Sequence, residues 1–295
     1  MPLYFIKPKR WPPSRPVQFI LAFLVLLVVL AVLGAWLFIG YRQSIGPDQS
    51  DGSDTSLPVS AEPLAGTANS LLIINEAGHE QFVLIQANPA AGRITVAPVP
   101  ASLGAADGST LADILRKHGS ARAKETVAAA LELPVKHYIT LSAAAAETYF
   151  GYLENGLTLM LAEDVSYTDQ NGAKVKISAG ERSLAPGQAA ALLRYTHWQN
   201  PNNAATVAAD LTAAVLNQHL LPDRSLSGHF AALSNAAQTD LRIDHFNSYR
   251  STLVYLAEQN DGTLCRRVTL SGTTADGLFT PDLTAIRTQT GLYAE

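Results

Sequence analysis

The chain has 295 residues, 47% of them apolar, and a formal net charge of −4 at pH 7. This composition is too apolar for a disordered chain, and the length suffices for one sizeable folded domain or two small ones. Residues 1–16 contain four bases and no acid, so the remainder holds 17 bases against 25 acids, a net charge of −8. The acidic bulk argues against a nucleic-acid-binding protein.

Residues 17–39, VQFILAFLVLLVVLAVLGAWLFI, carry no charge. As a helix they would extend about 35 Å, enough to cross a hydrocarbon core of about 30 Å. The run is longer than the apolar core of a signal peptide, and no small-residue cleavage site follows it. We therefore expect a single transmembrane helix, a signal anchor, rather than a cleaved signal or a buried soluble helix.

The charges around this span predict its orientation. Four bases precede it, whereas Arg42 alone follows closely before four acids. The positive-inside rule makes residues 1–16 a basic cytoplasmic tail and places the rest outside the cell membrane. Residues 40–67 are rich in Gly, Ser, Asp and Pro and predict a flexible extracellular tether. Residues 68–295 predict the outer domain.

The outer domain begins with three β-rich runs that turns separate, which predicts an antiparallel meander. They lie at residues 70–76, 80–89 and 92–100. A helix should follow from a cap at Ser109 or Thr110 to a stop at Gly119, and a second should end before Pro134.

Strand and helix patterns then alternate to the end of the chain. We expect strands at residues 135–141, 156–169 and 265–272, and helices at 142–153, 186–198, 203–221 and 243–259. This order predicts an α/β domain with a mixed central sheet and helices on both faces. Cys265 alternates with its neighbours like a strand residue and is expected to be a small buried side chain; it cannot form an internal disulfide.

The sequence contains no Walker loop, GxGxxG, HExxH or GxSxG motif, and its histidines are scattered. In chain order, however, five segments resemble those of the LytR-CpsA-Psr family of cell-envelope proteins. They are EQFVLIQANP, VAPVPASL, STLADILRKHGSARAKETVAAALELPVKHYITL, AGERSLAPGQAAALLRYTHW and NAATVAADLTAAVLNQHL. The resemblance covers about residues 68–221, and the tail more weakly.

This resemblance implies a function in building the cell wall. Proteins of the family have a short cytoplasmic tail, one span and an outer domain. They transfer a glycopolymer from polyprenyl pyrophosphate to peptidoglycan. Their arginines hold the pyrophosphate and their carboxylates hold a divalent metal, so Mg²⁺ would be expected only if transferase activity persists; otherwise we expect no cofactor.

The family's charged positions are mostly replaced here, so the chain resembles a divergent member. The arginine and aspartate of S-I-P-R-D-T correspond to Ala101 and Ser102. In the next motif Arg194 retains the first arginine, but Thr196 takes the place of the second. On the last helix the corresponding residues are about Asn203 for the aspartate, Thr206 and Ala209 for the arginines, and Asp210 for the glutamine.

The surviving acids and bases have structural interpretations too. Glu80 corresponds to the metal-binding aspartate, but its place after the turn at Gly78 favours an exposed residue. Asp107 is a second metal candidate, although its surroundings favour a turn. Arg194 could simply stabilise a helix end. We assign no catalytic residue, and we expect an apolar pocket between loop 99–108 and the Arg194 turn.

Three functions follow. We favour an outer-surface protein that binds a polyprenyl-linked ligand or a partner in envelope assembly, with transferase activity lost or weak, that is, a pseudoenzyme. The first alternative is an active phosphotransferase whose charges come from Arg93, Arg116, Lys117 or Arg182, which the acidic domain disfavours. The second is a wall-facing protein-interaction module.

Overall fold

A computed structural model of the chain describes residues 66–76, 78–150, 157–168, 172–220 and 234–293, which belong to one compact unit. The predicted tail and span, and all but the last two residues of the predicted tether, lie outside these residues. Among the helices described, none is long and apolar enough to cross a membrane.

The predicted meander forms the centre of the main sheet. Its strands are β1 (Ala68–Asn75), β2 (Gln81–Asn88) and β3 (Arg93–Val99). β1 pairs antiparallel with β2, and β2 antiparallel with β3, so the prediction is confirmed. All three strands are buried at most positions, as expected for continuous apolar runs that are covered on both faces.

The sheet has six strands in the order β10-β3-β2-β1-β4-β9. β4 (Val135–Ser142) runs parallel to β1, β10 (Cys265–Arg267) runs parallel to β3, and β9 (Gln238–Thr239) runs antiparallel to β4. The predicted mixed sheet is thus confirmed. Because β1, β3 and β4 share one direction, their last residues lie at the same edge, which we call the carboxyl edge. β10 runs the same way but ends at Arg267, opposite Val96 in the middle of β3.

The two helices predicted before β4 form one kinked element, α2 (Leu111–Leu131). The kink is at Gly119, whose φ of 80° suits glycine far better than other residues. Thr110 caps the helix: its hydroxyl accepts from the Asp113 N–H at 3.1 Å, and the Asp113 carboxylate accepts from the Thr110 N–H at 3.4 Å. The predicted cap and stop are therefore both present.

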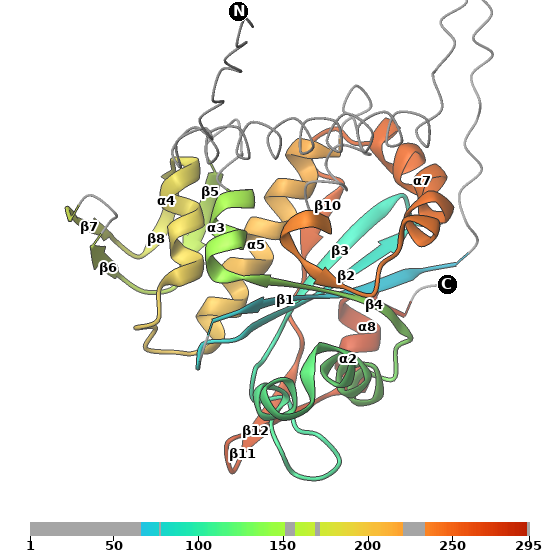
Figure 1. Ribbon diagram of the computed structural model, residues 1–295, viewed down its shortest axis with the longest axis horizontal. Helices are drawn as coiled ribbons and strands as arrows, with labels where there is room; N and C mark the ends of the chain where they lie inside the picture. The colour runs from blue at the N-terminus through green and yellow to red at the C-terminus, as the bar shows by residue number, and fades with distance from the viewer. Residues whose placement is uncertain (1–65, 77, 151–156, 169–171, 221–233, 294–295) are drawn as a thin grey trace, which may run out of the picture. The chain divides into compact units, whose positions relative to one another are not determined.

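The other helices cover both faces of the sheet. They are α3 (Ala143–Phe150), α4 (Pro186–Ala191), α5 (Asn202–His219), α7 (Ile243–Glu258) and α8 (Leu283–Gln289). Neighbouring residues of a strand point to opposite sides, so Leu71 and Ile73 pack with α2 and α8 while Leu72 and Ile74 pack with α3, α5 and α7. Figure 1 shows α2 and α8 below the sheet and the other helices above it.

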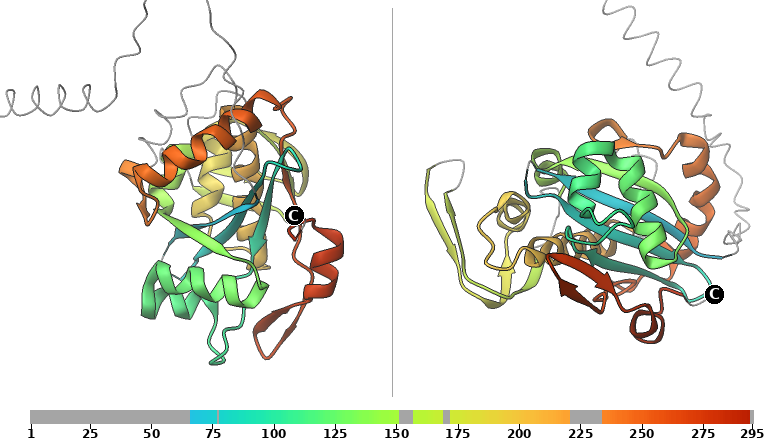
Figure 2. Two further views of the ribbon diagram at one scale, coloured as in Figure 1. Left: turned by 90° about the vertical axis from the view of Figure 1, so that its right-hand side faces the viewer. Right: turned by 90° about the horizontal axis from the view of Figure 1, so that it is seen from below.

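A β-arm extends from the domain between α3 and α4, and Figure 2 shows it to one side of the sheet. Its strands are β5 (Leu157–Leu161), β6 (Val165–Thr168), β7 (Lys174–Ile177) and β8 (Gly180–Leu184), with β5 paired to β8 and β6 to β7. The extended run predicted at 156–169 is broken before Val165. There the Asp164 carboxylate accepts a hydrogen bond from the Ala179 N–H at 2.7 Å.

Two further predictions need correction. The helix expected at 186–198 ends early: α4 is followed by the single 3₁₀ turn η1 (Leu192–Arg194), because the Leu193 carbonyl accepts from Nε2 of Gln81 at 2.9 Å instead of from a helical N–H. The strand expected at 265–272 divides into β10 and β11 (Gly272–Ala275), and β11 pairs with β12 (Leu278–Pro281).

Candidate functional site

The carboxyl edge is the candidate site. In open α/β sheets ligands bind outside the carboxyl ends of the strands. The loop after β3, the start of β2 and the α3 helix after β4 all meet there. Of the positions that the sequence singled out, Glu80 and the loop residues Ala101, Ser102 and Asp107 belong to these segments.

Ala101 and Ser102 follow β3, and their backbone carbonyls hydrogen-bond to neighbouring elements. The Ala101 carbonyl accepts from the Ala112 N–H at 3.0 Å, which joins the loop to α2. The Ser102 carbonyl accepts from the Phe279 N–H at 2.8 Å, which joins it to β12. Both residues are half-buried, and neither brings a charge to the edge.

Asp107 is a turn residue farther along the same loop. Its Oδ1 accepts from the Ser109 N–H at 3.0 Å and from the Ser109 hydroxyl at 2.5 Å. These hydrogen bonds favour the ionised form and lower the pKa of Asp107, which is fully exposed. Asp107 thus stabilises its own loop.

Glu80 lies just before β2, and its side chain is only 4% exposed. Its Oε1 lies 3.6 Å from Nε of Arg116 on α2 and accepts from the Gly78 N–H at 3.3 Å. Arg116 also donates to Asp113 at 2.9 Å. The carboxylate that corresponds to a metal ligand therefore faces a guanidinium group.

This arrangement does not fit Mg²⁺, which prefers several oxygen ligands around one point. Among the described residues, no three His, Cys, Asp or Glu side chains come together to hold a metal ion. The Asp107 carboxylate accepts hydrogen bonds from Ser109. We derive no metal-dependent step for this site.

Arg194 lies in η1, next to the start of β2. Its Nη1 is 3.3 Å from Oε2 of Glu147 on α3, and its side chain is half exposed. The neighbouring Leu193 carbonyl accepts from Gln81, which is 1% exposed and whose Oε1 has no hydrogen-bond partner. Because Phe82 pairs with Val99, this contact brings the Arg194 turn to the β3 end of the sheet.

The candidates near α5 serve to hold that helix in place. Asn203 donates from Nδ2 to Glu163 at 2.8 Å, and Asp210 pairs with Nε of Arg267 at 2.5 Å. Burial raises the pKa of Asp210, and the charge of Arg267 offsets part of that rise. Thr196, just after η1, is half-buried.

The two positions on α5 that correspond to the family's arginines, Thr206 and Ala209, carry no charge either. Ala209 is fully buried in the core, and the Thr206 hydroxyl donates to the Asn202 carbonyl at 3.0 Å.

The arginines described at this edge face acids: Arg116 faces Glu80 and Asp113, and Arg194 faces Glu147. Arg267, at the end of β10, faces Asp210. Of the bases that the sequence offered as replacements, Arg116 alone contacts a residue of the site. Arg182 donates to three carbonyls of the β-arm, and Arg93 begins β3 at the opposite edge. A pyrophosphate would have to compete with carboxylates for these cations.

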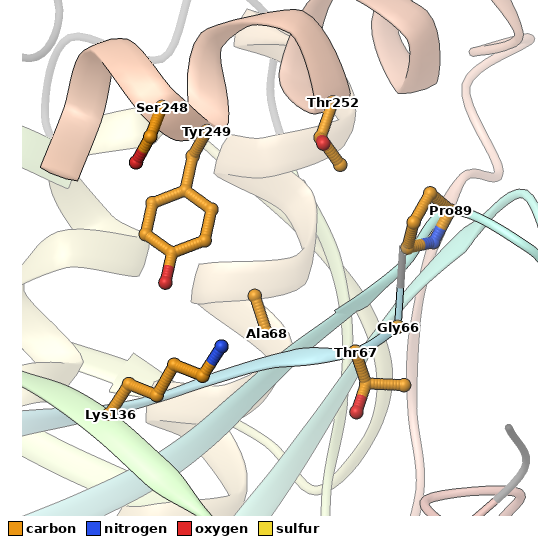
Figure 3. Close-up of a pocket in the computed structure, with 8 residues that line it drawn as sticks. All are labelled: Gly66, Thr67, Ala68, Pro89, Lys136, Ser248, Tyr249 and Thr252. Carbon is orange, nitrogen blue, oxygen red and sulfur yellow. The ribbon is translucent and has the colours of Figure 1, made fainter. Parts of the chain in front are cut away.

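A cavity of about 230 Å³ lies elsewhere, between α7 and the first residues of β1. Figure 3 shows the Lys136 ammonium and the Tyr249 hydroxyl pointing into it. This position is at the opposite edge from Arg194. The expected pocket between loop 99–108 and the Arg194 turn is not this cavity.

The sequence did not predict the cluster around Asp240. This carboxylate accepts from Nζ of Lys124 at 2.6 Å and from the Tyr138 N–H at 2.8 Å, and lies 3.5 Å from Nδ1 of His137. It thereby links α2, β4 and the chain that leads into α7. Burial alone would raise the pKa of Asp240, but the Lys124 and Tyr138 hydrogen bonds outweigh it and lower that pKa.

No family model and no curated protein matches the sequence. Solved structures match its fold. A candidate transcription regulator from Eubacterium siraeum is 14% identical with a TM-score of 0.62, over 81% of this chain and 96% of that one. TagV of B. subtilis is 14% identical with a TM-score of 0.57, over 75% and 93%.

A third match is TagT, described as bound to LI-WTA, which is 14% identical with a TM-score of 0.56 over 78% of this chain and 91% of that one. At such identities the likeness shows the fold alone. TagV and TagT are proteins of the LytR-CpsA-Psr family, so the chain has the fold that its sequence segments predicted: the mixed α/β fold of the LytR-CpsA-Psr proteins.

Proposed function

We propose that this chain is a membrane-anchored protein of the LytR-CpsA-Psr type whose outer domain takes part in attaching a glycopolymer to the cell envelope, or in regulating that step. Its fold supports this role, as does the wall teichoic acid precursor bound to the similarly folded TagT. The apolar run at residues 17–39 would anchor it, with the amino terminus in the cytoplasm.

Within this role we infer binding or regulation, with transferase activity lost or weak. The observation that carries this inference is the charge pattern at the carboxyl edge. Ala101, Ser102 and Thr196 replace charged residues, and each of the arginines described there faces a carboxylate. Phosphoryl transfer depends on positive charge around the phosphates, and this edge supplies little of it.

The size of the expected loss can be estimated. If each charge-assisted contact to pyrophosphate contributes roughly 1.5–3 kcal/mol, the loss of two removes roughly 3–6 kcal/mol. That corresponds to a roughly hundred- to ten-thousand-fold weaker interaction.

One observation favours the alternative, an active phosphotransferase. Arg116 lies beside Glu80 at this edge, and its side chain is half exposed. A bound pyrophosphate could draw Arg116 away from the carboxylates. This alternative predicts that turnover depends on Arg116.

The two functions are distinguished with the full chain in detergent micelles. Binding and turnover of a polyprenyl-pyrophosphate-linked sugar are measured with peptidoglycan and Mg²⁺. The variants are Arg194→Ala, Arg116→Ala and the double change Ala101→Arg with Ser102→Asp, with Arg250→Ala on exposed α7 as the control. We expect lipid binding without turnover in the natural chain.

Two other outcomes would support the alternative functions. Robust turnover that disappears with Arg194→Ala or Arg116→Ala would establish the transferase. Failure of the natural chain to bind the lipid would favour the wall-facing interaction module.

A further inference from the structure

A row of polar side chains crosses four strands on the face of the sheet that α2 and α8 cover. Asn69 of β1 pairs with Gln86 of β2, Gln86 with Thr95 of β3, and Thr95 with Arg266 of β10. Directly paired residues point to the same face, so these four side chains are neighbours in one line. Asn69, Gln86 and Thr95 are each 1% exposed.

Part of this row is hydrogen-bonded. Nε2 of Gln86 donates to Oδ1 of Asn69 at 2.9 Å and to the Leu292 carbonyl at 2.7 Å. The Leu292 carbonyl can only accept, so these bonds define which end of the Gln86 amide is the nitrogen. Nδ2 of Asn69 donates to the Pro134 carbonyl at 3.0 Å.

Three buried polar atoms in or beside the row have no hydrogen-bond partner. They are Oε1 of Gln86, Oγ1 of Thr95 and Nε of Arg93, the residue two positions before Thr95 on the same face of β3. Buried polar groups are nearly always paired, so three unpaired ones together indicate a missing partner. They offer one acceptor, one hydroxyl and one cationic donor.

Two arginines meet at the open end of the row. A Cβ placed on Gly291 would collide with Nη2 of Arg93 and would lie 3.9 Å from Nη2 of Arg266. The two guanidinium groups therefore reach the same point, and glycine leaves the space for them. In the described part of the chain, no carboxylate forms an ion pair with either arginine, in contrast to Arg116, Arg194 and Arg267.

The last described residues of the chain pass over this row. Gly291 lies over the arginines, the Leu292 carbonyl lies over β2, and the Tyr293 hydroxyl donates to the Leu131 carbonyl at the end of α2. Among the described residues no acid pairs with Arg93 or Arg266, so a ligand from solution is a candidate for neutralising the two charges.

We propose that Arg93, Arg266 and Thr95 form a binding site for a phosphate group at the edge of the sheet opposite the carboxyl edge. Two guanidinium groups suit a tetrahedral oxyanion because each can donate two parallel hydrogen bonds. The Thr95 hydroxyl can donate a further one. Oε1 of Gln86 can only accept, so a ligand that keeps a proton, such as hydrogen phosphate or a phosphomonoester, satisfies it while sulfate does not.

The site is independent of the proposed envelope function. It includes none of the residues at the carboxyl edge, and it lies on the other face of the sheet from the cavity beneath α7. The result of its test is therefore independent of any transferase assay.

The test is isothermal titration of the full chain in detergent micelles with inorganic phosphate, and separately with sulfate, at constant ionic strength. We expect one phosphate per chain and weaker binding of sulfate. Arg93→Gln and Arg266→Gln should each weaken phosphate binding about tenfold or more, because each removes a charge-assisted pair of hydrogen bonds. Arg250→Gln, an exposed arginine on α7, is the matched control and should bind as the natural chain does.

Thr95→Val separates a binding role from a structural one. It preserves shape and removes an unpaired buried hydroxyl, so the unliganded domain should be as stable as before or more so. Phosphate binding should nevertheless weaken. Absence of phosphate binding, or binding that all three variants leave unchanged, would overturn the proposal, and equal affinity for sulfate would remove Gln86 from the site.

Discussion

Glu80 and Arg116 face each other at the carboxyl edge, with 3.6 Å between Oε1 of the glutamate and Nε of the arginine. The glutamate side chain is 4% exposed, whereas the arginine side chain is 55% exposed. A buried carboxylate is costly without a partner, so the half-exposed guanidinium group compensates it. The same pair removes one acid from any metal site and one base from any pyrophosphate site.

Replacing Arg116 by Ala should lower the free energy of unfolding by about 1–2 kcal/mol, because Glu80 would remain buried without its cation. Urea denaturation of the full chain in detergent measures this loss. Arg122→Ala is the control on the same helix: it breaks an exposed pair with Glu125 and should cost less than about 0.5 kcal/mol. Adding Glu80→Gln to Arg116→Ala should recover part of the loss, and equal losses in the two arginine variants would contradict this account.

Asp240→Ala should lower the free energy of unfolding by about 2–3 kcal/mol, since it leaves the Lys124 ammonium and the Tyr138 N–H without their acceptor. Asp244→Ala is the matched control, because its pair with Arg242 is largely exposed. Denaturant midpoints at pH 7.5 give the comparison. If the two variants behaved alike, Asp240 would not link α2 to β4 as the structure indicates.

His137 predicts a dependence of stability on pH. Burial lowers the pKa of His137 below its ordinary value of 6.5, although the Asp240 carboxylate opposes this and His245, whose ring lies 4.7 Å away, adds to it. The unfolded chain therefore binds a proton at a higher pH than the folded chain does. The His137 contribution to stability should be present above about pH 6.5 and should fall as the pH drops below that value.

His137→Gln checks the sign of this effect. Denaturation is followed from pH 7.5 to 5.5 in the natural chain and in the variant. The stability of the variant should fall less over this range than that of the natural chain. A steeper fall in the variant would show that the folded state favours the charged imidazole.

The Cys265 thiol should be inert in the folded protein. Cys265 is buried next to β3, and burial raises the pKa of its thiol to about 12. Thiol reagents attack the thiolate, so labelling at pH 8 should be at least about a hundredfold slower in the native chain than in urea. Rapid native labelling would mean that β10 opens readily from the sheet edge.

The proposed orientation can be checked on intact cells. External protease should digest the outer domain and leave a membrane-embedded fragment containing residues 17–39. The comparison is permeabilised cells, in which the cytoplasmic tail also becomes accessible. A domain that stays protected until permeabilisation would reverse the orientation.

The local elements could be predicted from the sequence, because their causes are local. Apolar runs with turns between them produced the β1–β3 meander, the Thr110 side chain capped α2, and Gly119 supplied the backbone angle of its kink. The segments that resemble the LytR-CpsA-Psr family likewise indicated that the uncharged Ala101 and Ser102 stand where the family has an arginine and an aspartate. These features depend on neighbours along the chain.

The pairing of the remaining charges could not be predicted from the sequence, because it depends on how the chain folds. Strand order and helix packing bring together Glu80 with Arg116, Asp210 with Arg267, and Arg93 with Arg266 over Gly291. None of these pairs has a signal in the local sequence, because residues distant along the chain meet only after the sheet has formed. Long side chains have many rotamers, and the surrounding packing selects among them, so the chemistry of both sheet edges became visible only in the folded chain.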